Sequence, residues 1–310
     1  MRRFGSRGLL AALAFVAVVA SACSNSTTTT STSAAAPPTG TGVCGSVDTS
    51  GSDALAAVCK DGTIRVATDQ KYKPQSWYDV TTGTWMGFDV DVANEIAARL
   101  GVTADINHQD WKVVTAGSWE NRWDMNVGSM TDTIEREGLF SFTPAYYYTP
   151  AGVAVSSDNT TYTAISDLSG KKVCVGEQTT YEYYLRGNLE LGGGAPPFDY
   201  QISNPTVVTF STDTDALDEL NLGDGVRCDG AISAVPTIQS YIDDGGSMKL
   251  LGDPIFYEPL SVAFDKNDPI DNTSLVAAVS QIITDMHADG TLSALSEKWY
   301  KTDLTTIAGA

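Results

Sequence analysis

The sequence predicts an α/β protein built from two similar lobes, each a parallel-type sheet flanked by helices. Short apolar runs alternate with longer segments of helical periodicity, which is the pattern of a parallel sheet covered by helices. This alternation occurs twice, over residues 62–127 and again over residues 172–243. A chain of 310 residues is long enough for two such lobes.

The first alternation predicts three strands and two helices. In order they are strand Ile64–Thr68, helix Phe88–Leu100, strand Ala104–Asn107, helix Val113–Trp119 and strand Met125–Val127. The helix over residues 88–100 is the clearest, because one face carries Val90, Ala93, Ile96, Ala97 and Leu100. Gly101 suits the position that follows a helix C-terminus.

The second alternation predicts a short capped turn at Ser166–Leu168, followed by three strands that each lead into a helix. The pairs are Lys172–Val175 with Thr179–Leu189, Val207–Phe210 with Thr212–Leu222, and Gly230–Ser233 with Val235–Asp243. Ser211 or Thr212 is expected to cap the second of these helices. A last helix is expected over Ser274–His287, with Leu275, Ala278, Val279, Ile282, Ile283 and Met286 on one face.

The charge and composition of the chain exclude several classes of partner. Its formal net charge is −19, and such an acidic chain repels nucleic-acid phosphates, so no nucleic acid is expected as a partner. Its only histidines, His108 and His287, are far apart, and no C-x-x-C motif occurs. Neither a metal ion nor a cofactor is therefore expected.

The N-terminus has the pattern of an export signal over residues 1–22. Arg2, Arg3 and Arg7 form the positive region, Leu9–Ala20 forms the apolar region, and small residues at 20–22 suit a cleavage site. The apolar run is too short to span a bilayer, and no other stretch approaches that length.

Cys23 follows the cleavage site, and the junction resembles the lipoprotein box of bacteria. Ala20 stands where leucine is usual, which leaves open ordinary cleavage and an unmodified Cys23. The cysteine count favours lipidation, because the other four of the five cysteines can pair and leave Cys23 over. Residues 23–43, rich in Ser, Thr, Ala, Pro and Gly, then form a flexible tether.

An anion-binding segment follows the third predicted strand. Gly128, Ser129, Thr131 and Arg136 place a small residue, two hydroxyls and a guanidinium close together after Met125–Val127. Hydroxyls and free backbone N–H groups donate to an anion, and the planar guanidinium fits a carboxylate with two parallel hydrogen bonds. The segment therefore predicts a carboxylate site, against the alternative of a surface turn.

This segment resembles the ligand-carboxylate loop of the solute-binding proteins that deliver polar amino acids to ABC transporters. The resemblance runs from about Gly62 to Tyr300 and implies the type II fold of periplasmic binding proteins, with the ligand between lobes that close about a hinge. The implied lobes are residues 44–153 plus 262–304 and residues 154–261. The chain would cross between the lobes twice, in hinge strands near Ala151–Val155 and Leu260–Phe264.

Carried over position by position, the resemblance implies a set of cleft residues. Tyr72 would cover the ligand and Asp69 would reach a cationic or hydroxyl group, unless Asp69 only caps a turn. Trp111 would form a pocket wall or belong to the core. Thr180, at a helix N-terminus, would point toward the same carboxylate as Arg136.

One position departs from the family pattern. Where the family usually has an aspartate that pairs with the α-ammonium of the ligand, this chain has Ala234. An unpaired buried ammonium is costly. Either another acid takes its place, with Glu177 as the nearest candidate, or the ligand has no ordinary α-amino group.

Two disulfide bonds are expected. Cys174 and Cys228 lie in or just before strands that deliver binding residues to the same sheet edge, so they should be neighbours. Some amino-acid-binding relatives have a similar pattern. Cys44 and Cys59 would close a small N-terminal loop.

The resemblance implies a monomeric, lipid-anchored substrate-binding subunit of an ABC importer at the outer face of the cell membrane. It would capture a small carboxylate-bearing solute, an amino acid or a derivative, and dock on the permease without chemistry. The alternative is an exported enzyme of the same fold, similar to cyclohexadienyl dehydratases, with Glu177 or Asp69 as general acid. A sensory module is a third possibility.

Overall fold

The computed structural model describes residues 42–192 and 194–307. The export signal, Cys23 and nearly all of the expected tether lie outside the described residues. Over the described ranges, no helix combines the length and apolar character that crossing a membrane requires.

The first lobe is built on three parallel strands, β1 (Thr63–Thr68), β5 (Thr103–His108) and β6 (Met125–Thr131), with β1 in the middle. Helix α2 (Phe88–Leu100) buries all five residues of its predicted apolar face. It ends at Gly101, whose φ of 87° lies in the left-handed region that glycine adopts without strain. The predicted βαβαβ order is confirmed here.

Two elements of the first lobe differ from the prediction. Helix α3 spans Trp111–Thr115, and it stops early because the backbone turns to positive φ at Gly117 and Ser118. Strand β6 continues past Val127 to Thr131, because Met130 and Thr131 pair with β13 (Phe256–Asp265). The predicted carboxylate loop therefore begins inside a strand.

The second lobe repeats the parallel arrangement. Strand β9 (Lys172–Gly176) lies between β10 (Thr206–Phe210) and β11 (Gly230–Ala234) and is parallel to both. Each strand leads toward a helix, namely α5 (Thr180–Arg186), α6 (Asp213–Leu220) and α7 (Val235–Asp243). Thr212 is the N-cap of α6, as predicted, and its hydroxyl accepts a hydrogen bond from the Asp215 N–H at 3.0 Å.

Two long strands, β8 (Tyr147–Ser156) and β13, connect the lobes within one continuous sheet of order β10-β9-β11-β8-β13-β6-β1-β5. They pair with each other over residues 147–151 and 256–260. Residues 151–154 pair with β11 of the second lobe, and residues 260–263 pair with β6 of the first. The chain therefore passes from one lobe to the other a few residues before each expected crossing, where each strand exchanges its pairing with the other hinge strand for pairing with a lobe.

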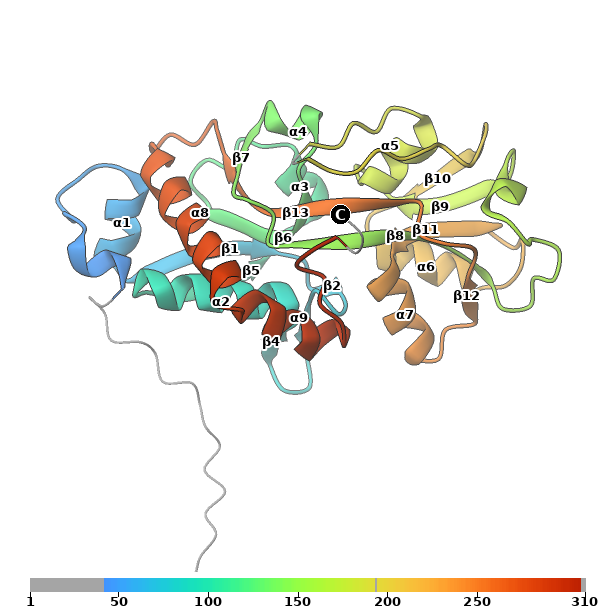
Figure 1. The fold of residues 1–310 in the computed structure, drawn as a ribbon, viewed down its shortest axis with the longest axis horizontal. Helices are drawn as coiled ribbons and strands as arrows, with labels where there is room; N and C mark the ends of the chain where they lie inside the picture. The colour runs from blue at the N-terminus through green and yellow to red at the C-terminus, as the bar shows by residue number, and fades with distance from the viewer. Residues whose placement is uncertain (1–41, 193, 308–310) are drawn as a thin grey trace, which may run out of the picture. The chain divides into compact units, whose positions relative to one another are not determined.

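After β13 the chain returns to the first lobe. Helices α8 (Thr273–Ala288) and α9 (Thr291–Tyr300) contact α2 (Figure 1). Leu275, Val279, Ile283 and Met286 of α8 are fully buried in the same core as β1 and β6. The return packs apolar side chains from both ends of the chain into one core, which is a stabilising arrangement.

Shorter elements complete the described chain. They are η1 (Val43–Ser46), α1 (Ala54–Asp61), β2 (Lys71–Tyr72), β3 (Ser76–Asp79), β4 (Thr84–Met86), α4 (Ile134–Glu137), β7 (Phe140–Phe142), η2 (Ile165–Leu168) and β12 (Met248–Leu250). Strands β2, β3 and β4 form a small antiparallel sheet that the sequence reasoning did not predict.

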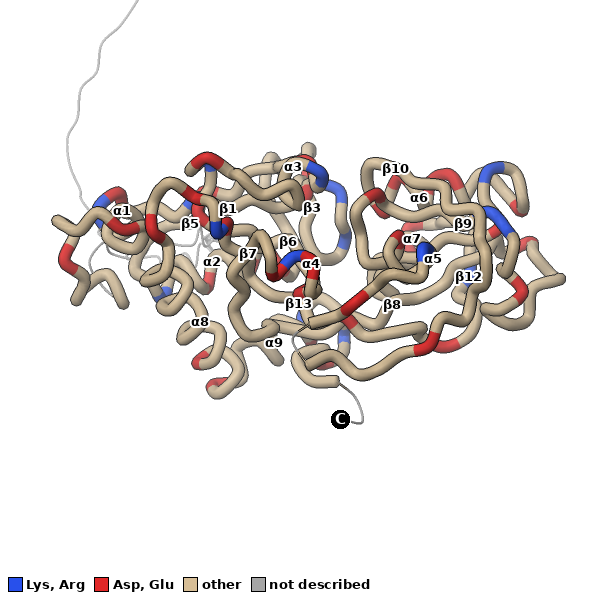
Figure 2. The backbone as a smooth tube through the Cα atoms, turned by 90° about the horizontal axis from the view of Figure 1, so that it is seen from above, with Lys and Arg blue, Asp and Glu red and all other residues tan. Residues whose placement is uncertain are grey.

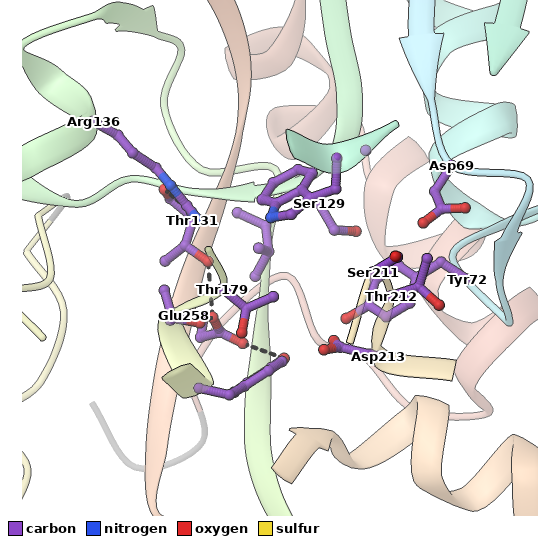
Figure 3. Close-up of a pocket in the computed structure, with 15 residues that line it drawn as sticks. Asp69, Tyr72, Ser129, Thr131, Arg136, Thr179, Ser211, Thr212, Asp213 and Glu258 are labelled. Atoms are coloured by element: carbon purple, nitrogen blue, oxygen red, sulfur yellow. Dashed lines mark hydrogen bonds between the residues drawn. The ribbon is translucent and has the colours of Figure 1, made fainter. Parts of the chain in front are cut away.

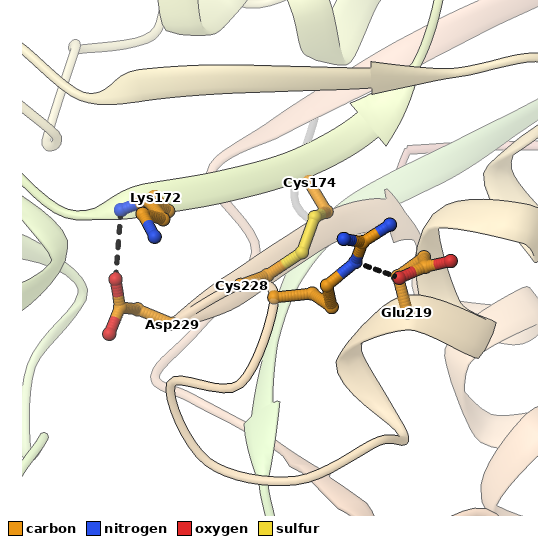
Figure 4. The surroundings of a disulfide bond; sticks show 6 residues. Lys172, Cys174, Glu219, Cys228 and Asp229 are labelled. Carbon is orange, nitrogen blue, oxygen red and sulfur yellow. Dashed lines mark hydrogen bonds and ion pairs between the residues drawn. A yellow bond between two sulfur atoms is a disulfide. The ribbon is translucent and has the colours of Figure 1, made fainter.

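Both expected disulfides are present. Cys174 of β9 and Cys228 before β11 are joined with their Cα atoms 5.8 Å apart, as Figure 4 shows. The parallel register explains this, because Ala231 lies opposite Cys174. Cys44 and Cys59 are joined with a Cα separation of 5.2 Å.

Acidic residues are distributed over both lobes (Figure 2). The negative charge of the chain, formally −19, is therefore spread over both lobes. Among the described residues, the buried charged side chains Arg136, Asp213 and Glu258 gather between the lobes.

Candidate functional site

A cavity of about 60 Å³ lies between the lobes, beside the β13 hinge strand. That volume holds several water molecules or a small solute. Residues from the first lobe, the second lobe and β13 line it together: Asp69, Tyr72, Trp111, Gly128, Ser129, Thr131, Arg136, Thr179, Thr180, Tyr181, Ser211, Thr212, Asp213, Glu258 and Leu260. Eight of the ten sequence-predicted site residues are in this set.

Arg136 supplies the cation of the cavity. Its backbone N–H donates to the Thr133 hydroxyl at the N-cap of α4, which fixes the start of its side chain. The guanidinium donates to the carbonyl oxygens of Thr131 at 3.0 Å and Gln178 at 2.9 Å. It is 4% exposed and lies 5.2 Å from the Trp111 ring. Burial lowers the pKa of Arg136, and the remaining N–H groups of its five are free for an anion.

The hydroxyls predicted to bind a carboxylate are already engaged with a buried acid. Glu258, at 2% exposure, accepts hydrogen bonds from the hydroxyls of Thr131 at 2.8 Å, Tyr181 at 2.7 Å and Thr180. Burial raises the pKa of Glu258, and these three donors oppose the rise. Sequence reasoning missed Glu258, although an acid two residues before the expected apolar crossing at Leu260–Phe264 was a usable signal.

Ser129 is hydrogen-bonded to a second buried acid, Asp89. Its hydroxyl donates to Asp89 at 2.7 Å and lies 2.6 Å from the Tyr147 hydroxyl, while its N–H donates to Tyr146 at 3.1 Å. Tyr146 also donates to Asp89 at 2.8 Å. Burial raises the pKa of the Asp89 carboxyl to about 7. This network stabilises Ser129 at a φ of 54°, a region that residues other than glycine seldom adopt.

Two further acids line the cavity, Asp69 and Asp213. In Figure 3 both lie on the side away from Arg136. One Asp69 oxygen accepts from the Lys71 N–H at 2.8 Å, and burial raises its pKa. Asp213 was missed by sequence reasoning. It begins α6 directly after β10, at the same sheet edge as the other site residues, and that position was the available signal.

Two predicted site residues do not line the cavity. Glu177 is turned toward Lys112, with an ion-pair distance of 3.6 Å. Ala234 is fully buried at the start of α7. Gln178, which follows Glu177 in the turn after β9 and has a φ of 59°, also contacts the first lobe.

Gln178 connects the two lobes, and sequence reasoning did not single it out. Its carbonyl accepts from the Trp111 indole N–H at 3.2 Å and from Arg136. Its side-chain oxygen accepts from the Thr115 hydroxyl at 2.6 Å. The structure therefore has the lobes in contact across the cavity mouth.

Comparisons with known proteins agree with this geometry. Residues 64–302 match the family model described as bacterial extracellular solute-binding proteins, family 3. The L-cystine-binding protein TcyJ of Escherichia coli (strain K12) is 30% identical over 254 residues, which are 81% of this chain and 87% of TcyJ.

Solved structures are similar as well. An ancestral arginine-binding protein bound to arginine is 26% identical, with a TM-score of 0.65 over 77% of this chain and 98% of that chain. The ancestral amino acid-binding protein AncCDT-1, a precursor of cyclohexadienyl dehydratase, is 27% identical, with a TM-score of 0.66 over 79% of this chain and 99% of that chain. The predicted type II periplasmic-binding-protein fold is confirmed. The chain belongs to the bacterial extracellular solute-binding proteins of family 3.

Proposed function

We propose that this protein is the lipid-anchored substrate-binding subunit of an ABC importer and that it captures an amino acid or a close derivative. The observation that carries the proposal is the charge arrangement of the interlobe cavity. A buried guanidinium, Arg136, lies at one side, and the carboxyls of Asp69 and Asp213 lie at the other (Figure 3). A small zwitterion, with a carboxylate and an ammonium, complements both sides at once.

The carboxylate of the solute is expected at Arg136. Thr131 and Thr180 donate to Glu258 in the unliganded arrangement, so the guanidinium is the principal donor left for an incoming anion. Two relatives support an amino-acid ligand by what they bind, L-cystine for TcyJ and arginine for the ancestral protein. Contacts of both lobes with the same cavity support capture by closure of one lobe on the other.

A panel of thermal-shift assays followed by calorimetry tests the ligand class. A ligand present at one hundred times its dissociation constant should add about 2.7 kcal/mol to the free energy of unfolding. We expect such a shift from at least one α-amino acid, with L-cystine and L-arginine tried first. A protein that responds to neutral sugars but to no amino acid would refute the proposal.

Catalysis is the competing function, and one observation favours it. The pKa of Asp213 is raised to about 7, which suits a general acid. Glu258 does not suit that role, because it accepts three hydroxyl hydrogen bonds, as an ionised carboxylate does. Incubating the protein with a cyclohexadienyl carboxylate and measuring product by chromatography separates the two functions, and the receptor proposal expects no turnover.

Lipidation of Cys23 remains part of the proposal. The residue follows a small-residue cleavage site, and both disulfides of the folded part use the other four cysteines. In the native host, Cys23→Ser should move the protein from the membrane fraction to the extracellular or periplasmic soluble fraction. An unchanged membrane association of that variant would contradict the anchor.

A further inference from the structure

The cavity contains more buried carboxyl groups than the protein itself pairs with cations. In the described part of the chain, no lysine or arginine nitrogen lies within ion-pair distance of Asp213 or Glu258. Asp213 is 8% exposed. Burying a carboxylate without a cation is costly, so its compensation is expected to come from a bound ligand.

We propose that Asp213 is the residue that pairs with the α-ammonium of the ligand, in place of the acid that is missing at Ala234. This inference rests on the proposed function, since it concerns the same cavity. It differs from the expectation for Glu177, which lies outside the cavity beside Lys112. The cation-binding acid thus comes from the start of α6 rather than from the end of β11.

The surroundings of Asp213 hold its carboxyl in a fixed position. One oxygen accepts from the Gly176 N–H at 3.1 Å, and the other accepts from the Ser233 hydroxyl at 3.2 Å. A Cβ on residue 176 would lie 2.5 Å from that first oxygen, so only glycine permits the approach. Each carboxylate oxygen can accept two hydrogen bonds, and one place on each therefore remains for the ligand.

The position of these anchors links Asp213 to residue 234. Ser233, whose hydroxyl holds the carboxyl, directly precedes Ala234 at the end of β11. Successive side chains of a strand point to opposite faces of the sheet, so Asp213 reaches this end of β11 from the α6 face, opposite to the side chain of residue 234. Ala234 itself is fully buried and offers no acid at this end of the strand.

The other two acids of the cavity are less suited to the role. Glu258 already accepts hydrogen bonds from three hydroxyls. Asp69 belongs to the first lobe beside Tyr72, and one of its oxygens closes its own loop through the Lys71 N–H. Asp69 is therefore assigned to the side chain of the ligand, and Asp213 to its ammonium.

The test compares each amino acid with its deaminated acid by isothermal titration calorimetry. The pairs are L-cystine with 3,3′-dithiodipropionate and L-arginine with 5-guanidinopentanoate. Asp213→Asn keeps both anchoring contacts, because its amide offers an oxygen to Gly176 and an N–H to Ser233. It should weaken amino-acid binding by about tenfold to a hundredfold and leave the deaminated acid nearly unchanged.

Two further variants complete the design. Asp215→Asn makes the same chemical change two residues along α6 but outside the cavity. Asp215 lies 3.9 Å from Lys71 of the first lobe, so this variant can change both affinities of a pair, but it should keep the wild-type preference for the amino acid. The double variant Asp213→Asn with Ala234→Asp should regain the preference for the amino acid. Thermal melts confirm that each variant is folded. Ser233→Ala removes one of the two contacts that hold the Asp213 carboxyl, so it should lower the preference for the amino acid, but by less than Asp213→Asn does.

The outcomes distinguish this inference from the proposed function. Wild type that binds no member of either pair, nor any other α-amino acid, overturns both. Wild type that prefers the amino acid, together with an Asp213→Asn variant that keeps this preference, overturns the inference alone. If the preference for the amino acid is lost in Asp69→Asn but kept in Asp213→Asn, the inference is also overturned, and the ammonium is assigned to Asp69.

Discussion

Arg136 is the residue on which carboxylate recognition depends in this account. It is the cation that lines the cavity, and Trp111 and two backbone carbonyls fix its plane. Replacing it with glutamine removes the charge and the paired donors. Hydrogen bonds to a charged group contribute about 1.5–3 kcal/mol each, so affinity for an amino acid should fall at least tenfold to a hundredfold.

Calorimetry measures this loss, and a thermal melt of the unliganded variant controls for folding. The amino acid and its deaminated acid should weaken together, unlike the response to Asp213→Asn. Unchanged affinity in a folded Arg136→Gln protein would show that the carboxylate binds elsewhere.

The raised pKa of Asp213 predicts how the stability of the protein without ligand depends on pH. Burial, with a smaller contribution from Glu258, raises the pKa of Asp213 to about 7, whereas an aspartate in an unfolded chain titrates near 4. The folded state therefore holds the proton more tightly, and stability present below pH 4 is lost as pH rises toward 7. Asparagine has no such proton, so Asp213→Asn should become the more stable protein as pH rises.

Urea denaturation at pH 5 and pH 8 measures this difference in the free energy of unfolding. The advantage of Asp213→Asn should grow between these values, to at most about 4 kcal/mol for the whole titration. Asp215→Asn should show no such growth. If the difference in the free energy of unfolding between Asp213→Asn and wild type stays constant or shrinks as pH rises, Asp213 is not a buried carboxyl with a raised pKa in solution.

At the scale of residues, the sequence located the cavity-lining residues of the first lobe better than the acids of the second lobe. Asp69, Tyr72, Trp111 and Arg136 lie in recognisable local patterns, and all four line the cavity. Glu177, named as the replacement acid, lies outside the cavity beside Lys112. Asp213 reaches the cavity only because β10 lies beside β9, a lateral neighbour relation that one sequence does not contain.

At the scale of elements, the two disulfides should stabilise the fold unequally. The Cys174–Cys228 bond closes 54 residues and the Cys44–Cys59 bond closes 15. In the chain-entropy model these closures stabilise the folded state by about 4 and about 3 kcal/mol. The first bond also joins two strands next to the ligand site.

Paired cysteine-to-alanine variants test this difference by chemical denaturation. The variant without Cys174 and Cys228 should lose more stability, and its cavity-side strands should lose hydrogen-exchange protection first. Equal losses from both variants would contradict the ranking. Detection of Cys174 and Cys228 as free thiols in exported protein would contradict the bond itself.

The parallel strands and their helices were predictable because periodicity, caps and glycine signals agree locally. Strand β6 was predicted too short, since Gly128 and Ser129 interrupt its apolar run while pairing with β13 continues it. The hinge strands were found, but their crossing point depends on which ladder partner each residue meets. The small sheet of β2, β3 and β4 left too weak an alternation to predict.

For the whole molecule, the lobes meet through polar contacts rather than a shared apolar core. Gln178 bonds to three first-lobe residues, and the Thr214 hydroxyl donates to the Lys71 carbonyl at 2.6 Å. The described apolar clusters lie mainly within one lobe or the other. Polar contacts of this kind exchange readily with water, so a ligand that bridges the lobes can shift the balance between open and closed forms.

The central claim is that the interlobe cavity holds a small molecule with a carboxylate at Arg136 and an ammonium at Asp213. The most direct measurement is mass spectrometry of the small molecule released by denaturing protein purified from its native host. The account predicts an α-amino carboxylate in wild type, absent or strongly depleted in Arg136→Gln. A released ligand that lacks a carboxylate, or the same ligand at equal occupancy in Arg136→Gln, would contradict it.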